Sequence, residues 1–184
     1  MRAFTTTLAL LLATAASAAP RPEKAGCQVP LPILYTLDYE FTLITHMPAT
    51  PDLHKKTISV SENKAVLDPV GNIYNMTLTD SELGVDYPKG TDGSAYLQVP
   101  KHTTWRQVAF NTEDEGRLKV QAAYACLEDD RAVTEVMPYQ KDGGALAWCV
   151  QEEGGKKGLA VEKKGQGNDC TEVRLIVTDG IRPL

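Results

Sequence analysis

The sequence predicts an all-β protein, folded as a single compact domain over residues 33–184 and built as a two-sheet β-sandwich. Three observations support this prediction. Apolar and polar residues alternate in many short segments, turn-forming residues separate these segments, and no segment has the period of a long amphipathic helix. A β-trefoil-like barrel is the alternative architecture, because it uses strands of similar number and length.

The first 18 residues have the features of a secretory signal peptide. Arg2 supplies the positive charge, residues 8–13 form a short apolar run, and the small residues 16–18 form a cleavage site. The apolar run is shorter than the roughly 20 residues that a membrane-spanning helix needs. We therefore expect cleavage after residue 18 and a secreted, extracellular protein, whose residues 19–32 form an extended N-terminal arm.

The expected strands follow one another along the whole mature chain. Alternation with a period of two is clearest in four segments, which cover 37–43, 73–79, 117–124 and 171–177. Shorter candidate strands cover 56–60, 64–68, 95–99, 107–110, 132–136, 145–150 and 158–162. Turns are expected between them at Asp68-Pro69, Gly71-Asn72, Asp92-Gly93, 142–144, Gly154-Gly155 and 165–167.

All four cysteines, Cys27, Cys126, Cys149 and Cys170, lie in the mature chain. An even number of cysteines in an exported chain is typical of disulfides, and no pair has the Cys-x-x-Cys spacing of a zinc knuckle. We favour the pairs Cys27 with Cys126 and Cys149 with Cys170, because the last two lie beside predicted neighbouring strands. Cys149 is therefore interpreted as a structural staple and not as a catalytic nucleophile.

The charge balance argues against a nucleic-acid partner. The full chain has a net charge of −5, and loss of the signal peptide removes one arginine and no acid, which leaves about −6. Binding to a phosphate backbone requires a concentrated basic surface, whereas the lysine pairs here are scattered and flanked by Glu or Gly. Since no later segment is apolar enough to span a bilayer, no membrane partner is expected either.

One modification signal agrees with the strand pattern. Asn75-Met76-Thr77 is an N-glycosylation acceptor, and the alternation places Asn75 and Thr77 on the polar face of their strand. We therefore expect a glycan on Asn75.

We assign no catalytic, cofactor-binding or metal-binding residue from the sequence. His46, His54 and His102 lie in polar, loop-like segments without metal-type spacing, so we interpret them as solvated histidines. The acidic clusters 113–115 and 128–130 lie at apparent turns and are interpreted as solvated caps, although paired acids also serve glycosidases.

Aromatic residues offer the better functional signal. Trp105 lies in a polar segment beside Arg106, so this pair is the predicted ligand contact: an aromatic platform for a sugar ring with a polar neighbour. Trp148 lies in an apolar run and is expected to be buried, packed on a disulfide. Whether Trp148 or the neighbouring Cys149 faces the core is left open, because the two alternate along a strand.

The order of four segments resembles a family of small secreted proteins. A strand "YEFTLIT" comes early, followed by "LAWCV", then "GLAVEKKGQGNDC" and the terminal strand "CTEVRLIV". This order is similar to that of small secreted ascomycete fungal proteins of the cell-wall or IgE-binding type, over the two ends of the mature chain. The resemblance implies a fungal source, an extracellular β-domain and a role at the cell surface or in contact with a host.

Together these observations favour a secreted, non-enzymatic binding protein. The expected partner is a cell-wall polysaccharide or a host protein. A secreted hydrolase or a protease inhibitor on an all-β scaffold is the alternative, which a catalytic cleft or a rigid exposed loop would favour.

Overall fold

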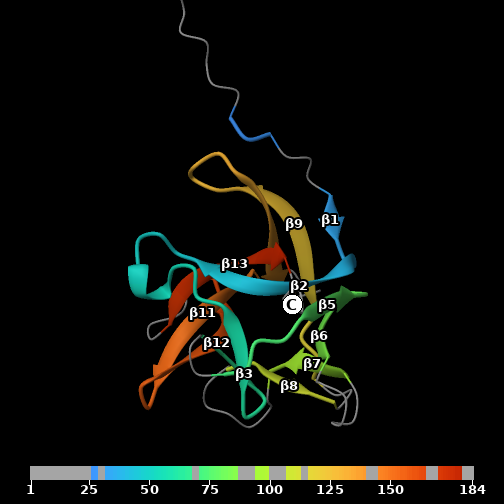
Figure 1. Cartoon of the computed structure of the whole chain (residues 1–184), viewed down its shortest axis with the longest axis vertical. Coiled ribbons are helices and arrows are strands. Elements are labelled where there is room, and N and C mark those ends of the chain that lie inside the picture. The colour runs from blue at the N-terminus through green and yellow to red at the C-terminus, as the bar shows by residue number, and fades with distance from the viewer. Residues whose placement is uncertain are drawn as a thin grey trace, which may run out of the picture.

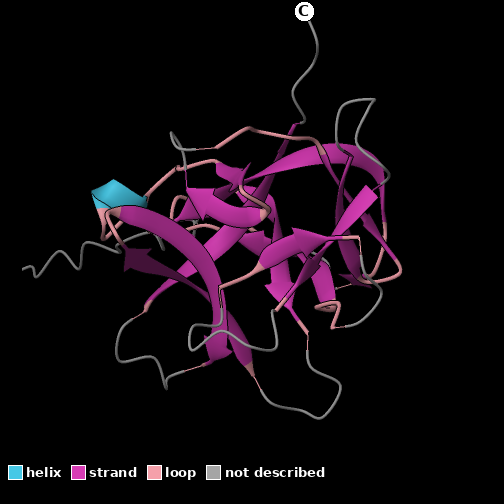
Figure 2. Cartoon of the chain, turned by 90° about the horizontal axis from the view of Figure 1, so that it is seen from below, coloured by secondary structure: helices cyan, strands magenta, loops and turns pink. Residues whose placement is uncertain are grey.

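The structure is a computed structural model, and it describes residues 26–28, 32–67, 71–86, 94–99, 107–112, 116–139, 145–164 and 170–179. Within these ranges the protein is all-β, as predicted: thirteen strands join in antiparallel pairs, and one short 3₁₀ turn, η1 (Pro51–Leu53), follows the second strand. Figures 1 and 2 show the strands wrapped around a common interior. The predicted signal peptide lies outside the described residues.

The strands have the following bounds. They are β1 (Ile33–Leu34), β2 (Leu37–His46), β3 (Ile58–Ser61), β4 (Lys64–Leu67), β5 (Met76–Thr79), β6 (Glu82–Asp86), β7 (Ser94–Gln98), β8 (Ala109–Asn111), β9 (Val120–Cys126), β10 (Ala132–Pro138), β11 (Leu146–Glu153), β12 (Lys156–Lys163) and β13 (Thr171–Asp179).

The expectation of two separate sheets is not confirmed, because the pairings join all the described strands into one sheet. From β2 the pairing runs through β5, β6, β7, β8, β4, β12 and β11 to β13, and β13 pairs with β2 again. The circuit is therefore closed, which leaves its strands without a free edge at that seam. The trefoil-like alternative stays a prediction.

A branch leaves this circuit at β13. There β10 pairs with β13, β9 pairs with β10, and β1 pairs with β9. Figure 1 shows β9 rising above β2 and β13, so the hairpin of β9 and β10 extends beyond the closed part of the sheet. Tyr124 shares the alternation of residues 117–124 with the buried Val120 and Ala122, but it lies on this projecting hairpin and is 39% exposed.

The core fills the interior of the circuit. The alternation of β5 is confirmed, because Met76 and Leu78 are fully buried, and so are Phe41 and Leu43 of β2. Tyr39 departs from the pattern and is half exposed. Its strand changes register against β5 between Leu37 and Phe41, and such an irregularity turns an intervening side chain away from the core.

Three hairpins turn through two residues with positive φ. These pairs are Glu62-Asn63, Asp80-Ser81 and Gly154-Gly155. Two successive left-handed residues form the type I′ turn, whose twist suits a hairpin. Strand β6 was not predicted from the sequence, since its turn uses Asp80 and Ser81 in a conformation that glycine or asparagine usually supplies.

The cysteines form the two pairs favoured from the sequence. Cys27 bonds to Cys126, which ties the N-terminal arm to the end of β9, and Cys149 of β11 bonds to Cys170, directly before β13. Both residues left open in the sequence are buried: Trp148 is 2% exposed and Cys149 is 3% exposed. Trp148 packs in the main core, so it does not pack on the disulfide, which lies on the opposite face of β11.

The part of the chain that the structure describes contains no helix with the length and apolar character needed to cross a membrane.

Candidate binding cleft

A cleft opens where β13 changes its partner along one edge. Residues 171–173 of β13 pair with β11, whereas Leu175 and Ile176 pair with β10. Strands β10 and β11 therefore separate next to Arg174. We name the resulting cavity of about 340 Å³ the fork cleft. Its polar lining is Gln121, Glu135, Lys164, Glu172 and Arg174, and its apolar lining includes Met137, Tyr139, Leu146, Trp148 and Val173.

The indole of Trp148 connects the two strands that separate. Its Nε1 donates a hydrogen bond of 2.7 Å to the backbone oxygen of Val136 in β10. Because this donor is buried, the bond removes an unpaired polar group from the core. Trp148 thus holds β10 and β11 in a defined position at the base of the fork cleft.

Arg174 is held in the fork cleft by a carboxylate of β10. Its Nη2 and Nε donate to Glu135 Oε2 at 2.8 and 3.1 Å. The hydrogen bonds from Arg174 to Glu135 raise the pKa of the guanidinium above its ordinary value, so Arg174 stays charged. A positioned guanidinium still has further donors, and these suit ligand oxygen atoms.

A chain of polar contacts extends from Arg174 to two histidines. Glu128 Oε1 lies 3.9 Å from Arg174 Nη1, and Glu128 Oε2 accepts a 2.7 Å hydrogen bond from His46 Nε2. The ring of His46 meets the ring of His54 edge to face, with centroids 5.0 Å apart. His54 Nδ1 in turn accepts from the backbone N–H of Met47 at 3.2 Å.

The electrostatic environment shifts two pKa values along this chain. The pKa of Glu128 is lowered by a hydrogen bond from its own backbone N–H and then by His46. The pKa of His54 is lowered by burial first and then by the neighbouring charges of His46 and Lys55. Deprotonated Glu128 and neutral His54 are therefore favoured in the folded protein.

One of the interpretations made from the sequence is wrong at these residues. His46 is the last residue of β2 and its side chain is only 11% exposed, so it is not a solvated loop histidine. Glu128 lies in the turn between β9 and β10 and its side chain is 63% exposed, as expected, and it also accepts a hydrogen bond from His46. The hydrogen bond between His46 and Glu128 joins positions 82 residues apart in the sequence, and no local sequence pattern indicates such a contact.

Gln121 places an acceptor in the fork cleft. Its Oε1 atom is buried and has no hydrogen-bond partner among the described residues. A buried oxygen without a partner costs free energy, so native proteins normally satisfy it with water or a ligand. This oxygen has almost no accessible surface, so a bound molecule reaches it only after the Gln121 side chain changes its rotamer.

An aromatic ring completes the lining. Tyr139 follows β10 directly and is 38% exposed, which leaves part of its ring open to solvent. Its backbone N–H donates to the oxygen of Lys119 at 2.8 Å, which fixes its position. Since Glu135 and Glu172 balance Lys164 and Arg174, the lining has no net charge and favours a neutral ligand.

Several residues selected from the sequence are not among the residues that line the fork cleft or are not described by the structure. Trp105, Arg106, His102 and the acidic cluster 113–115 lie outside the described residues. Asn75 is described and lies directly before β5, where its Nδ2 donates to Glu40 Oε2 at 2.8 Å. Neither Asn75 nor Glu40 lines the fork cleft.

One group of side chains has the proximity of a metal site among the described residues. Cys149, Glu162 and Cys170 place their ligand atoms within 4.8 Å of one another. Both sulfur atoms are bonded to each other, and a disulfide cannot supply the thiolates that bind a metal. This group is therefore part of the structural staple.

No family model, curated protein or solved structure matches this chain. The lining of the fork cleft is therefore the feature that bears on function. Sequence patterns placed Arg174 and Gln121 on the polar faces of their strands, but they contained no signal that these residues share one cavity.

Proposed function

We propose that the protein is secreted and binds a neutral cell-wall polysaccharide in the fork cleft, without performing catalysis on it. The observation that carries this proposal is the lining of that cleft. An accessible tyrosine ring and a positioned guanidinium line one cavity whose charges balance. Sugars match such a lining, because their C–H faces pack on aromatic rings and their hydroxyls donate and accept hydrogen bonds.

The size of the cavity supports a glycan over a folded host protein. Its volume of about 340 Å³ lies in the range of small-ligand pockets. A stable interface with another protein instead buries roughly 800 Å² on each partner, usually over a flatter surface. A short stretch of hexose units is therefore the better match.

The proposed location is the outside of the cell. Two disulfides are consistent with an extracellular protein, and the N-terminal residues have the pattern of a signal peptide. The resemblance to small secreted fungal proteins supports a role at a fungal cell surface. An N-linked glycan on Asn75 belongs to the same proposal, and endoglycosidase treatment of the secreted protein should lower its mass unless Asn75→Gln is present.

The direct experiment measures binding of soluble β-glucan and chitin oligosaccharides by calorimetry. Tyr139→Ala should weaken binding about tenfold, since it removes the aromatic platform. Tyr124→Ala is the matched control, because Tyr124 is equally exposed at 39% but lies outside the fork cleft. Equal affinities for the two variants, or no binding of any neutral glycan by the unmodified protein, would refute the proposal.

Trp105 gives a second comparison. It is the ligand contact predicted from the sequence, and it precedes Gln107, which does not line the fork cleft. Loss of binding in Trp105→Ala with normal binding in Tyr139→Ala would assign the glycan to the sequence-predicted contact instead.

A further inference from the structure

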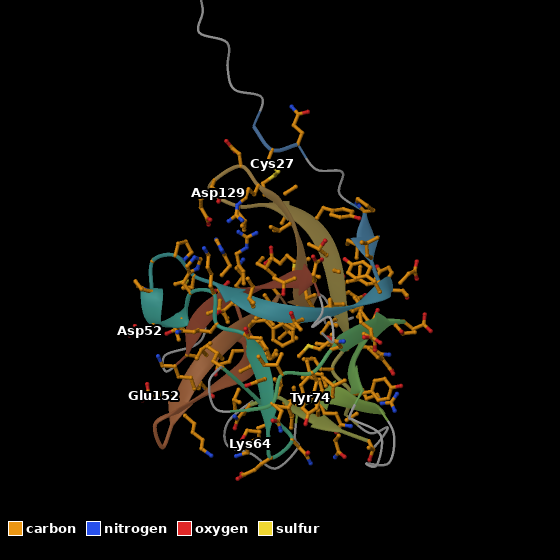
Figure 3. The ribbon with its side chains drawn as sticks, viewed as in Figure 1. Cys27, Asp52, Lys64, Tyr74, Asp129 and Glu152 are labelled. Atoms are coloured by element: carbon orange, nitrogen blue, oxygen red, sulfur yellow. A yellow bond between two sulfur atoms is a disulfide. The ribbon has the colours of Figure 1, made fainter. Side chains whose placement is uncertain are left out.

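A second cavity lies between two neighbouring hairpins. We name it the hairpin cleft, because its lining comes from the β3–β4 hairpin, the β11–β12 hairpin and Gln107. Figure 3 shows Lys64 and Glu152, which both line this cavity, on these two hairpins. The volume of the cavity is about 80 Å³, so it accepts a chemical group of a few non-hydrogen atoms.

The cavity forms where a segment enters between two strands. Val66 of β4 pairs with Gly158 of β12, but beyond this pair residues 107–109 separate the strands. The N–H of Val108 donates to Leu159 at 2.9 Å, and the N–H of Ala65 donates to Val108 at 3.1 Å. These backbone bonds hold the entering segment on both sides, so they also define the position of Gln107.

Gly158 provides the space for the Gln107 side chain. A methyl group built on Gly158 would overlap the Gln107 amide, which therefore lies directly over the glycine. Glycine inside a strand is typical of such a close approach. The amide of Gln107 is thus placed against the floor of the hairpin cleft by the shape of the backbone.

The floor of the hairpin cleft is small and apolar. Val66 is only 3% exposed and does not belong to the main core, in which its neighbours Ala65 and Leu67 take part. Beside the Gln107 amide, which covers Gly158, it offers an apolar surface that fits a methyl group.

The walls are amides and the rim is balanced in charge. Gln107 forms one wall and Gln151 another; Gln151 Nε2 lies 3.5 Å from Glu162 Oε1, which leaves the amide oxygen as the acceptor. Around them the exposed charges are Glu62, Lys64, Glu152 and Lys156. Two acids and two bases leave no net charge, so the rim selects neither an anion nor a cation.

We propose that the hairpin cleft binds the acetamido group of a neutral amino sugar, the N-acetylhexosamine unit of chitin-like glycans. The acetamido methyl packs on Val66, its N–H donates to Gln151, and its carbonyl accepts from Gln107. This site is separate from the fork cleft and goes beyond the proposed function, because it assigns a different ligand group to different residues.

The test compares N,N′-diacetylchitobiose with cellobiose, which lacks the acetamido groups, by NMR titration of the full mature protein. We expect the diacetyl sugar to shift the amide signals of Gln107, Gln151 and Gly158, and cellobiose to leave them in place. Gln107→Leu should weaken this binding about tenfold, since it removes one hydrogen bond to the ligand and keeps the size of the side chain.

Gln121→Leu is the matched control. It makes the same substitution in the fork cleft, and it should leave the binding of diacetylchitobiose to the hairpin cleft unchanged while it weakens glycan binding in the fork cleft. Failure of the proposed function and failure of this inference therefore give different patterns of lost binding among the variants. Gly158→Ala supplies a second variant, which displaces the Gln107 amide without removing it, and melting curves report whether each variant folds.

Two results would overturn the inference. One is equal binding of cellobiose and diacetylchitobiose at the hairpin cleft, and the other is unchanged binding in Gln107→Leu. Nε-acetyl-lysine amide separates the sources of the acetamido group: weaker binding than the diacetyl sugar supports the sugar, whereas tighter binding contradicts the assignment to an amino sugar.

Discussion

The fork cleft and the hairpin cleft arise in the same way but differ in what holds them. Each forms where an antiparallel sheet changes its pairing, at Arg174 in β13 and at residues 107–109 between β4 and β12. Side chains hold the fork cleft, through Trp148 to Val136 and Arg174 to Glu135. The hairpin cleft instead depends on backbone hydrogen bonds and on the missing side chain of Gly158.

The two kinds of support determine where ligand binding and stability are coupled. A cleft held by buried side chains belongs to the core, so substitutions there should affect the free energy of unfolding as well as ligand binding. In a cleft held by the backbone, the side chains of the walls do not stabilise the fold. Substitutions in the hairpin cleft should therefore change binding with little effect on stability.

The largest expected effect is at Trp148. Trp148→Ala should lower the free energy of unfolding by about 3–5 kcal/mol, because it leaves a cavity in the core and removes a buried hydrogen bond. Trp148→Phe should cost less, since it retains most of the apolar volume. Gln107→Leu is the comparison in the hairpin cleft, with an expected change within about 0.5 kcal/mol. Denaturant unfolding measures the free energy of unfolding of all three variants. A loss below 1 kcal/mol in Trp148→Ala would contradict the proposed difference between the two clefts.

A smaller effect is expected at the ion pair of the fork cleft. Glu135→Ala should lower the free energy of unfolding by about 1–2 kcal/mol, since it leaves the half-buried Arg174 guanidinium without its main acceptor. Asp129→Ala breaks the exposed pair with Arg131 and should have no measurable effect. If the two variants unfold at the same denaturant concentration, Glu135 does not position Arg174.

The pH dependence of the free energy of unfolding should also differ between the regions of the two clefts. Because burial lowers the pKa of His54 in the folded protein, the unfolded chain binds more protons below the ordinary value of 6.5. Stability should therefore fall as the pH falls from 7.5 through 6.5, and His54→Gln should reduce this slope. Glu82 and Glu128, whose pKa values are also lowered, should add a further loss below about 4.5.

Ligand binding to the two clefts should also respond differently to pH between 7.5 and 6.0. His54 is linked to Arg174 of the fork cleft through His46 and Glu128, whereas no histidine lines the hairpin cleft among the described residues. Binding of diacetylchitobiose to the hairpin cleft should thus stay constant between pH 7.5 and 6.0. A parallel decline with stability would show that the two regions are not independent.

Much of the fold follows from local sequence, and the clefts do not. Alternation predicted the strands around Met76 and Leu175 because one buried face imposes a period of two. The pairing of cysteines followed from neighbouring strands. The change of partner at Arg174 depends instead on contacts such as the one with Glu135, 39 positions away, and local patterns carry no information on such pairs.

Two local features also differ from what the sequence pattern predicts, and each difference has a physical reason. Tyr39 has the spacing of a core residue, but the change of register between Leu37 and Phe41 leaves it half exposed. Strand β6 follows a turn at Asp80-Ser81 that contains no glycine, although both residues have positive φ. The surrounding tertiary structure overrides the local preference in each case.

If a neutral polysaccharide binds in the fork cleft, an NMR titration with a neutral β-glucan hexasaccharide should detect it at the residues that line this cleft. Binding there predicts shifts of the Trp148 indole N–H, the Arg174 Nε–H and the Tyr139 backbone amide. In Tyr139→Ala the Trp148 and Arg174 shifts should need about tenfold more ligand, and in Tyr124→Ala they should be retained. Signals that stay in place at these three groups, or that move only around Gln107 and Gly158, would contradict binding in the fork cleft.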